Sequence, residues 1–369
     1  MNKSIVIELF DESDVQINGP QPWDIQIHND ELYSRILRRG SLGFGEAYSE
    51  GWWDCDQLDE LIARLLRNQA ERRIQRKGRL WLYKLANFIW NKQNRSKAYE
   101  IGLKHYDKGN ELFKAMLDPT MTYSCGYWNN AKKLEEAQRN KLDLICRKLM
   151  LSPGMSILDI GCGWGSFLKH AASRYAVRGT GITVSKNQIE WAKESCKGLP
   201  VEFLYSDYRN IQGEFDRIVS IGMIEHVGYK NYRVYMESVD RHLKHDGIFL
   251  LHTIGGGRSQ IATDPWIDKY IFPNSLIPSI AQIGKAVEDL FVMEDWHNFG
   301  LDYDKTLMSW HRNFVQNWKT IESRYDSRFY RIWSYYLLSS AGTFRARRNH
   351  VWQIVFSKPG NIRPYLSIR

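Results

Sequence analysis

The stretch ILDIGCGWGSF, residues 157–167, decides the fold of this chain. Its apolar run ends in three alternating glycines, Gly161, Gly163 and Gly165, and a helical pattern follows. This order predicts a buried strand, a tight turn and a helix start, because glycine lets a ligand approach the backbone and a helix N-terminus presents free N–H groups. A dinucleotide-binding loop would have the spacing G-x-G-x-x-G. The spacing here is G-x-G-x-G after Asp159, which favours a loop that binds S-adenosylmethionine (SAM).

From about residue 101 the chain alternates between strand and helix patterns around this loop. Strands are expected at 156–160, 178–183, 201–207, 217–221, 248–254, 291–296 and 352–358. Such alternation is typical of a doubly wound, Rossmann-like α/β fold with a mostly parallel seven-stranded sheet, whose ligands lie at the carboxyl ends of the strands. The interval 255–290 is too long for a simple crossover, so it is interpreted as a helical insertion that helps to form the substrate site.

The whole chain is interpreted as a small α+β N-terminal domain, a basic amphipathic helical connector and a catalytic domain, expected at 1–65, 66–100 and 101–369. In the N-terminal domain, Ile5–Phe10 and Trp23–His28 are expected to form strands. Residues 31–39 and 57–66 are expected to form short helices.

The net charge of +9 is concentrated in one segment. Residues 64–97 contain eleven Lys and Arg but one acid, Glu71, so the rest of the chain is close to neutral. Aromatic and aliphatic side chains such as Trp81 and Phe88 alternate with these charges. Basic and apolar side chains together favour a helix that lies on an anionic membrane surface. An inter-domain helix with a solvated basic side, or a nucleic-acid-binding helix, is the alternative interpretation.

Cysteine usage and hydropathy bound the cellular setting. The five cysteines are scattered and include no C-x-x-C pair, which argues for reduced thiols and against disulfides or a zinc site. The N-terminal apolar run is too short for a signal peptide, and no window approaches eighteen apolar residues. A cytoplasmic protein without a membrane-spanning segment is therefore expected.

Polar side chains follow several of the expected strands. Thr183, Ser185 and Gln188 come after the second strand, and they can hydrogen-bond a ribose although no acid accompanies them. Asp207 comes after the third strand, where it could face the adenine amino group or cap a helix.

Candidate acid–base groups follow the next two strands. Glu225 and His226 come after the fourth strand and could serve in proton transfer or simply start a helix. His252 lies in the fifth strand near its end, either as a core residue or as part of the site.

Taken together, several segments closely resemble the cyclopropane-fatty-acyl-phospholipid synthases. They are YDKGNELFKAMLDPTMTYSCGYW (106–128), LDIGCGWGSF (158–167), FDRIVSIGMIEHVG (215–228), GIFLLHTIG (247–255), DPWIDKYIFP (264–273), VMEDWHNFGLDYDKTL (292–307) and AGTFRAR (341–347). The resemblance runs from the N-terminal domain to the last strand. It is closer to the long bacterial enzymes than to the shorter mycolic-acid methyltransferases, which lack the N-terminal domain.

The resemblance implies a class I SAM-dependent methyltransferase and assigns a part of SAM to each loop. The glycine loop would hold the methyl donor, the segment before the first strand its methionine part, and the next two loops its ribose and adenine. The matching positions are Tyr123, Ser124, Gly161, Gly163, Gly165, Thr183, Ser185, Gln188, Asp207 and Tyr208.

The resemblance also implies a bicarbonate ion near the sulfonium, held by Cys125, Glu225, His252, Ile254 and Tyr303. Glu225, His252, Tyr303 and Cys125 are the implied catalytic residues. Ring closure on an alkene requires loss of a proton from the transferred methyl, and a bound anion could accept that proton and stabilise positive charge. No metal is implied.

One position departs from the family. Its members often have a cysteine just before the AGxFRAR run, and this chain has Ser339 and Ser340 there. Methyl transfer from a sulfonium to an alkene needs a base and no nucleophilic thiol, so the chain is still expected to be active.

The implied function is transfer of a methylene group from SAM to the cis double bond of unsaturated acyl chains in membrane phospholipids. The implied partner is an anionic membrane surface at the inner face of the cytoplasmic membrane, and the implied assembly is a homodimer. A related methyltransferase that leaves a methyl branch or a hydroxylated chain is the alternative within the class. A non-catalytic lipid-binding protein and a nucleic-acid methyltransferase are less consistent with the motifs, so nucleic acid is not expected as a partner.

Overall fold

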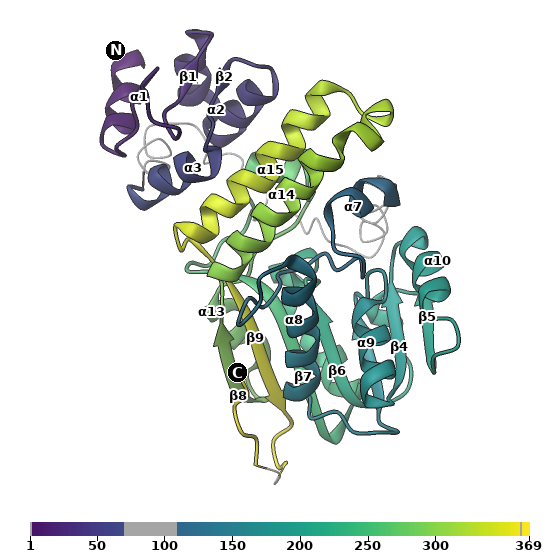
Figure 1. Cartoon of the computed structure of the whole chain (residues 1–369). Helices are drawn as coiled ribbons and strands as arrows, with labels where there is room; N and C mark the ends of the chain where they lie inside the picture. The colour runs from purple at the N-terminus through teal and green to yellow at the C-terminus, as the bar shows by residue number, and fades with distance from the viewer. Residues whose placement is uncertain (1, 70–108, 362–363) are drawn as a thin grey trace. The chain divides into compact units, whose positions relative to one another are not determined.

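The computed structural model describes residues 2–69, 109–361 and 364–369. These form two compact units, each assembled from separate stretches of chain (Figure 1). The first unit comprises Met1–Asn91, Ile261–Pro273 and Tyr303–Asn349, and the second comprises Lys92–Gln260, Asn274–Asp302 and His350–Arg369. Each unit thus combines several separate stretches of the chain, whereas the domains expected from the sequence are continuous ranges. From residue 70 onward, the expected basic connector lies outside the described residues.

The second unit is built on a seven-stranded, mostly parallel sheet in the described part of the chain. Its strands are β3 (Ser156–Ile160), β4 (Arg178–Thr183), β5 (Val201–Tyr205), β6 (Phe215–Ile221), β7 (Leu243–Gly256), β8 (Val292–Asn298) and β9 (Asn349–Ser357). Their order is β5-β4-β3-β6-β7-β9-β8, with β3 to β7 paired in parallel and β8 antiparallel to β9. The expected α/β fold and the seven expected strands are confirmed.

Helices cover both faces of this sheet (Figure 1). Those on one face are α11 (Tyr232–His242) and α13 (Ile280–Val287), and those on the other are α8 (Leu134–Lys148), α9 (Ser166–Tyr175) and α10 (Lys186–Ser195). Successive residues of a strand point to opposite faces. Leu158 and Phe249 accordingly pack toward α11 and α13, whereas their neighbours Ile157 and Leu250 pack toward α8, α9 and α10. Both faces are thus apolar, as a parallel sheet requires.

Short helical segments lie at the edges of this unit. They are α7 (Asn110–Met116), η2 (Tyr208–Asn210), η3 (Ile224–His226) and η4 (Tyr229–Asn231). The η2 and η3 turns follow β5 and β6 directly, so they stand at the carboxyl edge of the sheet.

The first unit is mostly helical. Its elements are α1 (Asn2–Asp11), β1 (Gln26–Ile27), α2 (Glu31–Ser49), β2 (Trp53–Asp54), α3 (Leu58–Arg67), α12 (Pro265–Tyr270), nearly all of α14 (Leu301–Ile321), η5 (Glu322–Arg324) and α15 (Ser327–Arg345). Strands β1 and β2 form a two-stranded antiparallel sheet. Little of the expected β content is therefore present in the described N-terminal residues.

The strand expected at Ile5–Phe10 was wrong, because this run belongs to helix α1. A short apolar run does not distinguish a strand from a buried helix. Val6, Leu9 and Phe10 are buried with helical spacing, so α1 buries one face without a partner strand.

The helix expected at 31–39 continues to Ser49 through a kink at Gly40, where φ is 55°. The glycine-rich continuation is helical because α2 is closely packed there. A Cβ on Gly45 would lie 2.5 Å from the Trp266 ring of α12. Tertiary contact thus selects a helix that local glycine content disfavours.

Helix α15 packs against α2 and α3 within the first unit. The guanidinium of Arg345 pairs there with the carboxylates of Asp59, Glu60 and Asp304. The expected insertion at 255–290 is divided between the units, because α12 belongs to the first unit and α13 covers the sheet of the second.

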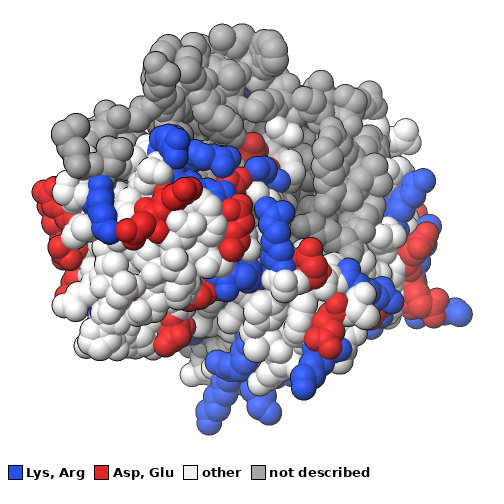
Figure 2. Space-filling model, turned by 90° about the horizontal axis from the view of Figure 1, so that it is seen from above, with Lys and Arg blue, Asp and Glu red and all other residues white. Residues whose placement is uncertain are grey.

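On the face that Figure 2 shows, basic and acidic side chains of the described residues lie interspersed. Among the described helices, none combines the length and the hydropathy that a bilayer crossing requires.

Candidate SAM and catalytic site

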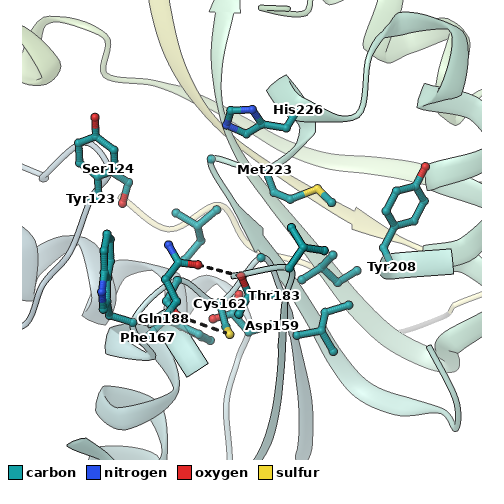
Figure 3. Close-up of a pocket in the computed structure, with 18 of the residues that line it drawn as sticks. Tyr123, Ser124, Asp159, Cys162, Phe167, Thr183, Gln188, Tyr208, Met223 and His226 are labelled. Atoms are coloured by element: carbon teal, nitrogen blue, oxygen red, sulfur yellow. Dashed lines mark hydrogen bonds between the residues drawn. The ribbon is translucent and has the colours of Figure 1, made fainter. Parts of the chain in front are cut away.

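A pocket opens at the carboxyl edge of the sheet in the second unit (Figure 3). Ile160, Thr183, Ser206 and Ile221 line it, and they stand at or just beyond the ends of β3, β4, β5 and β6. This is the edge where parallel α/β sheets bind their ligands. The pocket therefore lies where the strand pattern placed the ligand site.

The glycine loop forms part of the pocket wall. Gly161 and Gly163 line the pocket, whereas Gly165 is the N-cap residue of α9 and does not line it. Gly161 has φ of 86°, and a Cβ there would lie 2.8 Å from Met223 Cγ. Only glycine fits this position, because the loop needs both a left-handed backbone and close contact with the next strand end.

Tyr123 and Ser124 line one end of the pocket, and Tyr208 lies at the other (Figure 3). Helix α8 holds the Ser124 segment in place. Gln138 Nε2 donates to Ser124 O at 2.8 Å, and Lys141 Nζ donates to Ser124 Oγ at 2.9 Å. The hydroxyl of Ser124 is therefore positioned by a buried side chain of another element.

Two of the three residues expected to face the ribose meet in the pocket. Thr183 Oγ1 donates to Gln188 Oε1 at 2.8 Å, and both residues line the pocket. Ser185 has another place: its hydroxyl accepts from Gln188 N at 3.4 Å as the N-cap of α10, and it does not line the pocket. Its observed role is to begin the helix that carries Gln188.

Asp207 and Tyr208, expected near adenine, line the pocket with Arg209. Asp207 Oδ1 accepts from Arg209 N at 3.0 Å, so this carboxylate does cap the η2 turn. The Arg209 guanidinium also lies 3.0 Å from both Asp207 oxygens and 4.4 Å from the centre of the Tyr208 ring. The Asp207 carboxylate and the Tyr208 ring are thus held by one cation.

Asp159, the acid before the glycine loop, also lines the pocket. Its side chain is 1% exposed, and neither carboxylate oxygen has a hydrogen-bond partner. Burial raises the pKa of Asp159 to about 7, although Lys141 opposes this shift. A buried acceptor without a partner fits a bound ligand that brings a donor, such as the ammonium group of SAM.

Glu225 and Ile254, two of the expected bicarbonate ligands, are in contact. Glu225 Oε1 accepts from Ile254 N at 2.8 Å, while Oε2 is buried and has no partner. Burial raises the pKa of Glu225 above its usual value. Glu225 does not line the pocket, but its neighbours Met223 and His226 do.

His252 is buried on β7, and burial lowers its pKa well below the usual value. Gln353 Nε2 lies 3.3 Å from His252 Nδ1. An amide N–H can only donate, so this contact makes Nδ1 the acceptor and leaves the ring proton on Nε2. His252 is therefore neutral and presents an Nε2–H donor.

Cys125 and Tyr303 complete the expected set. Cys125 is fully buried beside Ser124, and its thiol donates to Gly126 O at 3.1 Å. Tyr303 belongs to the first unit, where its ring lies 4.7 Å from Phe344 and 5.8 Å from Trp310.

Sequence reasoning missed several residues that line the pocket. They are Lys141, Asp159, Trp164, Arg209 and Met223, whereas His226, which also lines the pocket, was already a candidate acid–base group. A signal existed for Lys141: it lies three residues after Gln138, within a helix whose buried residues include Leu142 and Ile145. Polar residues on the apolar stripe of a helix indicate a special environment.

The chain matches known proteins along most of its length. Residues 93–354 match the family described as mycolic acid cyclopropane synthetase. The cyclopropane-fatty-acyl-phospholipid synthase of Escherichia coli is 49% identical over 96% of this chain and 93% of its own.

Solved structures show the same fold over a smaller region. The structure of a cyclopropane synthase from Mycobacterium tuberculosis has a TM-score of 0.67 and 31% identity, covering 70% of this chain and 98% of its own. A mycolic acid cyclopropane synthase in complex with S-adenosylhomocysteine (SAH) and CTAB has a TM-score of 0.66, with the same identity and coverage. The chain therefore belongs to the mycolic acid cyclopropane synthetase family and is a SAM-dependent methyltransferase.

Proposed function

We propose that this enzyme transfers a methylene group, derived from the methyl of SAM, to the cis double bond of unsaturated acyl chains in membrane phospholipids. The observation that carries the proposal is the 49% identity to the Escherichia coli synthase, which extends over 96% of the chain and so includes the N-terminal unit. The pocket at the carboxyl edge of the sheet supports it.

The pocket residues divide the binding of SAM among them. When bound, SAM supplies an electrophilic methyl group on its sulfonium. Gly161 and Gly163 admit the ligand close to the backbone, and the helix N-terminus that follows adds free N–H groups. Thr183 and Gln188 offer hydrogen bonds for ribose hydroxyls, and Tyr208 offers an aromatic wall for adenine.

The reaction needs a base, because ring closure removes a proton from the transferred methyl. We assign this base to bicarbonate, which would accept that proton when bound. Two features fit a small anion that carries a proton: the partnerless Glu225 Oε2, and the Nε2–H that the Gln353 contact leaves on His252.

Burial shifts the pKa values of two groups at this site toward their uncharged forms. Burial raises the pKa of Glu225 above its usual value, which favours the neutral form beside a bound anion. His252 is neutral and donates without competing for the proton. Cys125 is fully buried next to Ser124, which fits an apolar contact of the ion, and Tyr303 stays an expected ligand from the family resemblance alone.

We further propose that the enzyme is a homodimer that binds peripherally to the inner face of the cytoplasmic membrane. The support for membrane binding is the charge of residues 64–97, where eleven cationic side chains accompany one acid, whereas the homodimer follows only from the family resemblance. About 1 kcal/mol of attraction is expected for each basic residue that approaches an anionic surface.

Lipid mass spectrometry tests the reaction. Vesicles of unsaturated phospholipid are incubated with the enzyme and SAM, and the acyl chains are analysed for mass and unsaturation. We expect each modified acyl chain to gain the mass of one CH₂ and to lose its double bond. A methyl-branched chain that stays unsaturated, or a hydroxylated chain, would contradict it and support the related methyltransferase activity instead.

Glu225→Ala tests the assignment of the base site. We expect turnover to fall by roughly 100-fold or more, the usual scale for a lost acid–base element, with SAH affinity within a few-fold of wild type. The matched control is Glu237→Ala, which removes a carboxylate from the exposed side of α11, where it pairs with Arg233. Lost SAH affinity with unchanged turnover at saturating SAM would refute the assignment.

A further inference from the structure

Helix α8 contains two fully buried lysines with different surroundings. Lys148 is 0% exposed and has an ion-pair partner, since its Nζ lies 3.3 Å from Asp295 Oδ2. Lys141 is 1% exposed and lines the pocket, where its Nζ donates to the Ser124 hydroxyl at 2.9 Å. No ion pair of Lys141 is found within the described ranges. Buried lysines are rare unless paired, so Lys141 needs an anion.

The electrostatics of Lys141 favour an anionic ligand. Burial lowers the pKa of Lys141 to about 8, while Asp118, Cys125 and Asp159 raise it, so the side chain is mostly cationic at pH 7. A cation in a site that excludes water interacts strongly with an opposite charge.

Asp159 presents the complementary charge in the same pocket. Both of its oxygens are buried without a partner, and it is not ion-paired with Lys141. One pocket thus contains a buried cation and a buried carboxyl group that do not neutralise each other directly. An α-amino acid group carries the matching pair, a carboxylate and an ammonium, within a few bonds.

We propose that Lys141 binds the α-carboxylate of the methionine part of SAM and orients the Ser124 hydroxyl toward it. Because the Lys141 ammonium occupies an acceptor position of Ser124 Oγ, the hydroxyl proton is free to donate to the same carboxylate. Asp159 then accepts from the α-ammonium. This inference rests on SAM binding as stated above and does not depend on which acyl chain is methylated.

The competing explanation is that Lys141 only fastens the Ser124 segment to α8. That task is already performed by Gln138, whose Nε2 donates to Ser124 O at 2.8 Å and lies 3.4 Å from Thr122 O. Fastening by neutral amide contacts does not require a buried charge. The two explanations differ in whether the effect of Lys141 depends on the ligand's carboxylate.

The test compares SAH with its decarboxylated analogue, which retains the adenosine, the thioether and the amine. Affinities are measured at pH 7 by isothermal titration calorimetry with the full chain. For Lys141→Met we expect SAH to bind about 10- to 100-fold more weakly, the range for a lost charge-assisted hydrogen bond, and the analogue to bind within about twofold of wild type. Lys148→Met is the matched control, and its SAH affinity should stay within about twofold.

Several outcomes would overturn the proposal. Equal weakening of both ligands by Lys141→Met would show that Lys141 acts through the loop, and unchanged SAH affinity would show that it does not bind the carboxylate. If Lys141→Met does not fold, the wild type and Lys141→Arg decide: both must prefer SAH to the analogue by at least about tenfold. Equal affinity of the wild type for the two ligands refutes the proposal. A chain that shows the SAH preference but no cyclopropane product would refute the proposed function alone.

Discussion

Replacement of Gly163 by alanine separates the cost to folding from the cost to binding. Gly163 has φ of 53°, and a Cβ built on it meets no heavy atom within 4 Å. The residue also lines the pocket. The added methyl group would therefore not clash with the protein, and it would occupy space that the ligand must approach.

The expected magnitudes follow from this geometry. A single alanine in the left-handed region costs about 1–2 kcal/mol of unfolding free energy. Gly154 is the matched control, because its φ is 83° and its Cβ also meets nothing within 4 Å, but it precedes β3 and does not line the pocket. A methyl forced into a fitted contact costs about 1–3 kcal/mol. This corresponds to roughly 5- to 150-fold in SAH affinity for Gly163→Ala alone.

The assay combines urea unfolding, followed by far-UV circular dichroism, with calorimetric titration of SAH. Both variants should lose a similar unfolding free energy, and only Gly163→Ala should bind SAH more weakly. The reasoning is refuted if Gly163→Ala binds SAH like wild type, or if Gly154→Ala weakens SAH binding to the same extent.

Three other expectations concern the connector, the serine that departs from the family, and pH. Neutralisation of five basic residues of the connector should weaken binding to anionic vesicles in a sedimentation assay; they are Arg72, Arg73, Arg76, Lys77 and Arg79. Added salt should weaken the binding of the wild type in the same way. Equal binding of variant and wild type at low salt would favour an inter-domain helix. Ser340→Ala should keep most activity in the lipid assay, because this α15 residue is not needed as a nucleophile, and abolished turnover in a folded variant would reopen the assignment of the base. Burial opposes ionisation of Glu46, but hydrogen bonds from Lys269 and Arg35 lower its pKa to about 2. Glu46→Gln should therefore lower the free energy of unfolding by its full amount above pH 4.5, and the difference from wild type should shrink as pH falls toward 2. A difference in urea midpoint that does not change with pH would contradict this.

The interpretations that depended on local pattern alone had mixed outcomes. The seven expected strands are present. The central strands β3, β6 and β7 contain apolar runs that are buried on both faces, as a parallel sheet requires, whereas the edge strands β5 and β8 are largely exposed. The run Ile5–Phe10 has similar apolar content but forms helix α1, since a short run is compatible with either structure until its partners are known. Gly40 could not be recognised as a kink inside a longer helix, because the contacts that continue α2 come from distant residues such as Trp266.

The sequence by itself determined the ligand edge of the sheet, since β3 and the glycine loop are adjacent in the chain and the carboxyl ends of parallel strands converge. Only the tertiary structure decided which side chains meet there. Lys141 of α8 contacts Ser124, which is seventeen residues away in the sequence, and Glu225 contacts Ile254, which is twenty-nine residues away. The physical reason is that a buried polar group is defined by what surrounds it. Local spacing predicts the backbone path, whereas the pairing of buried charges and hydrogen bonds depends on contacts that only the folded chain creates.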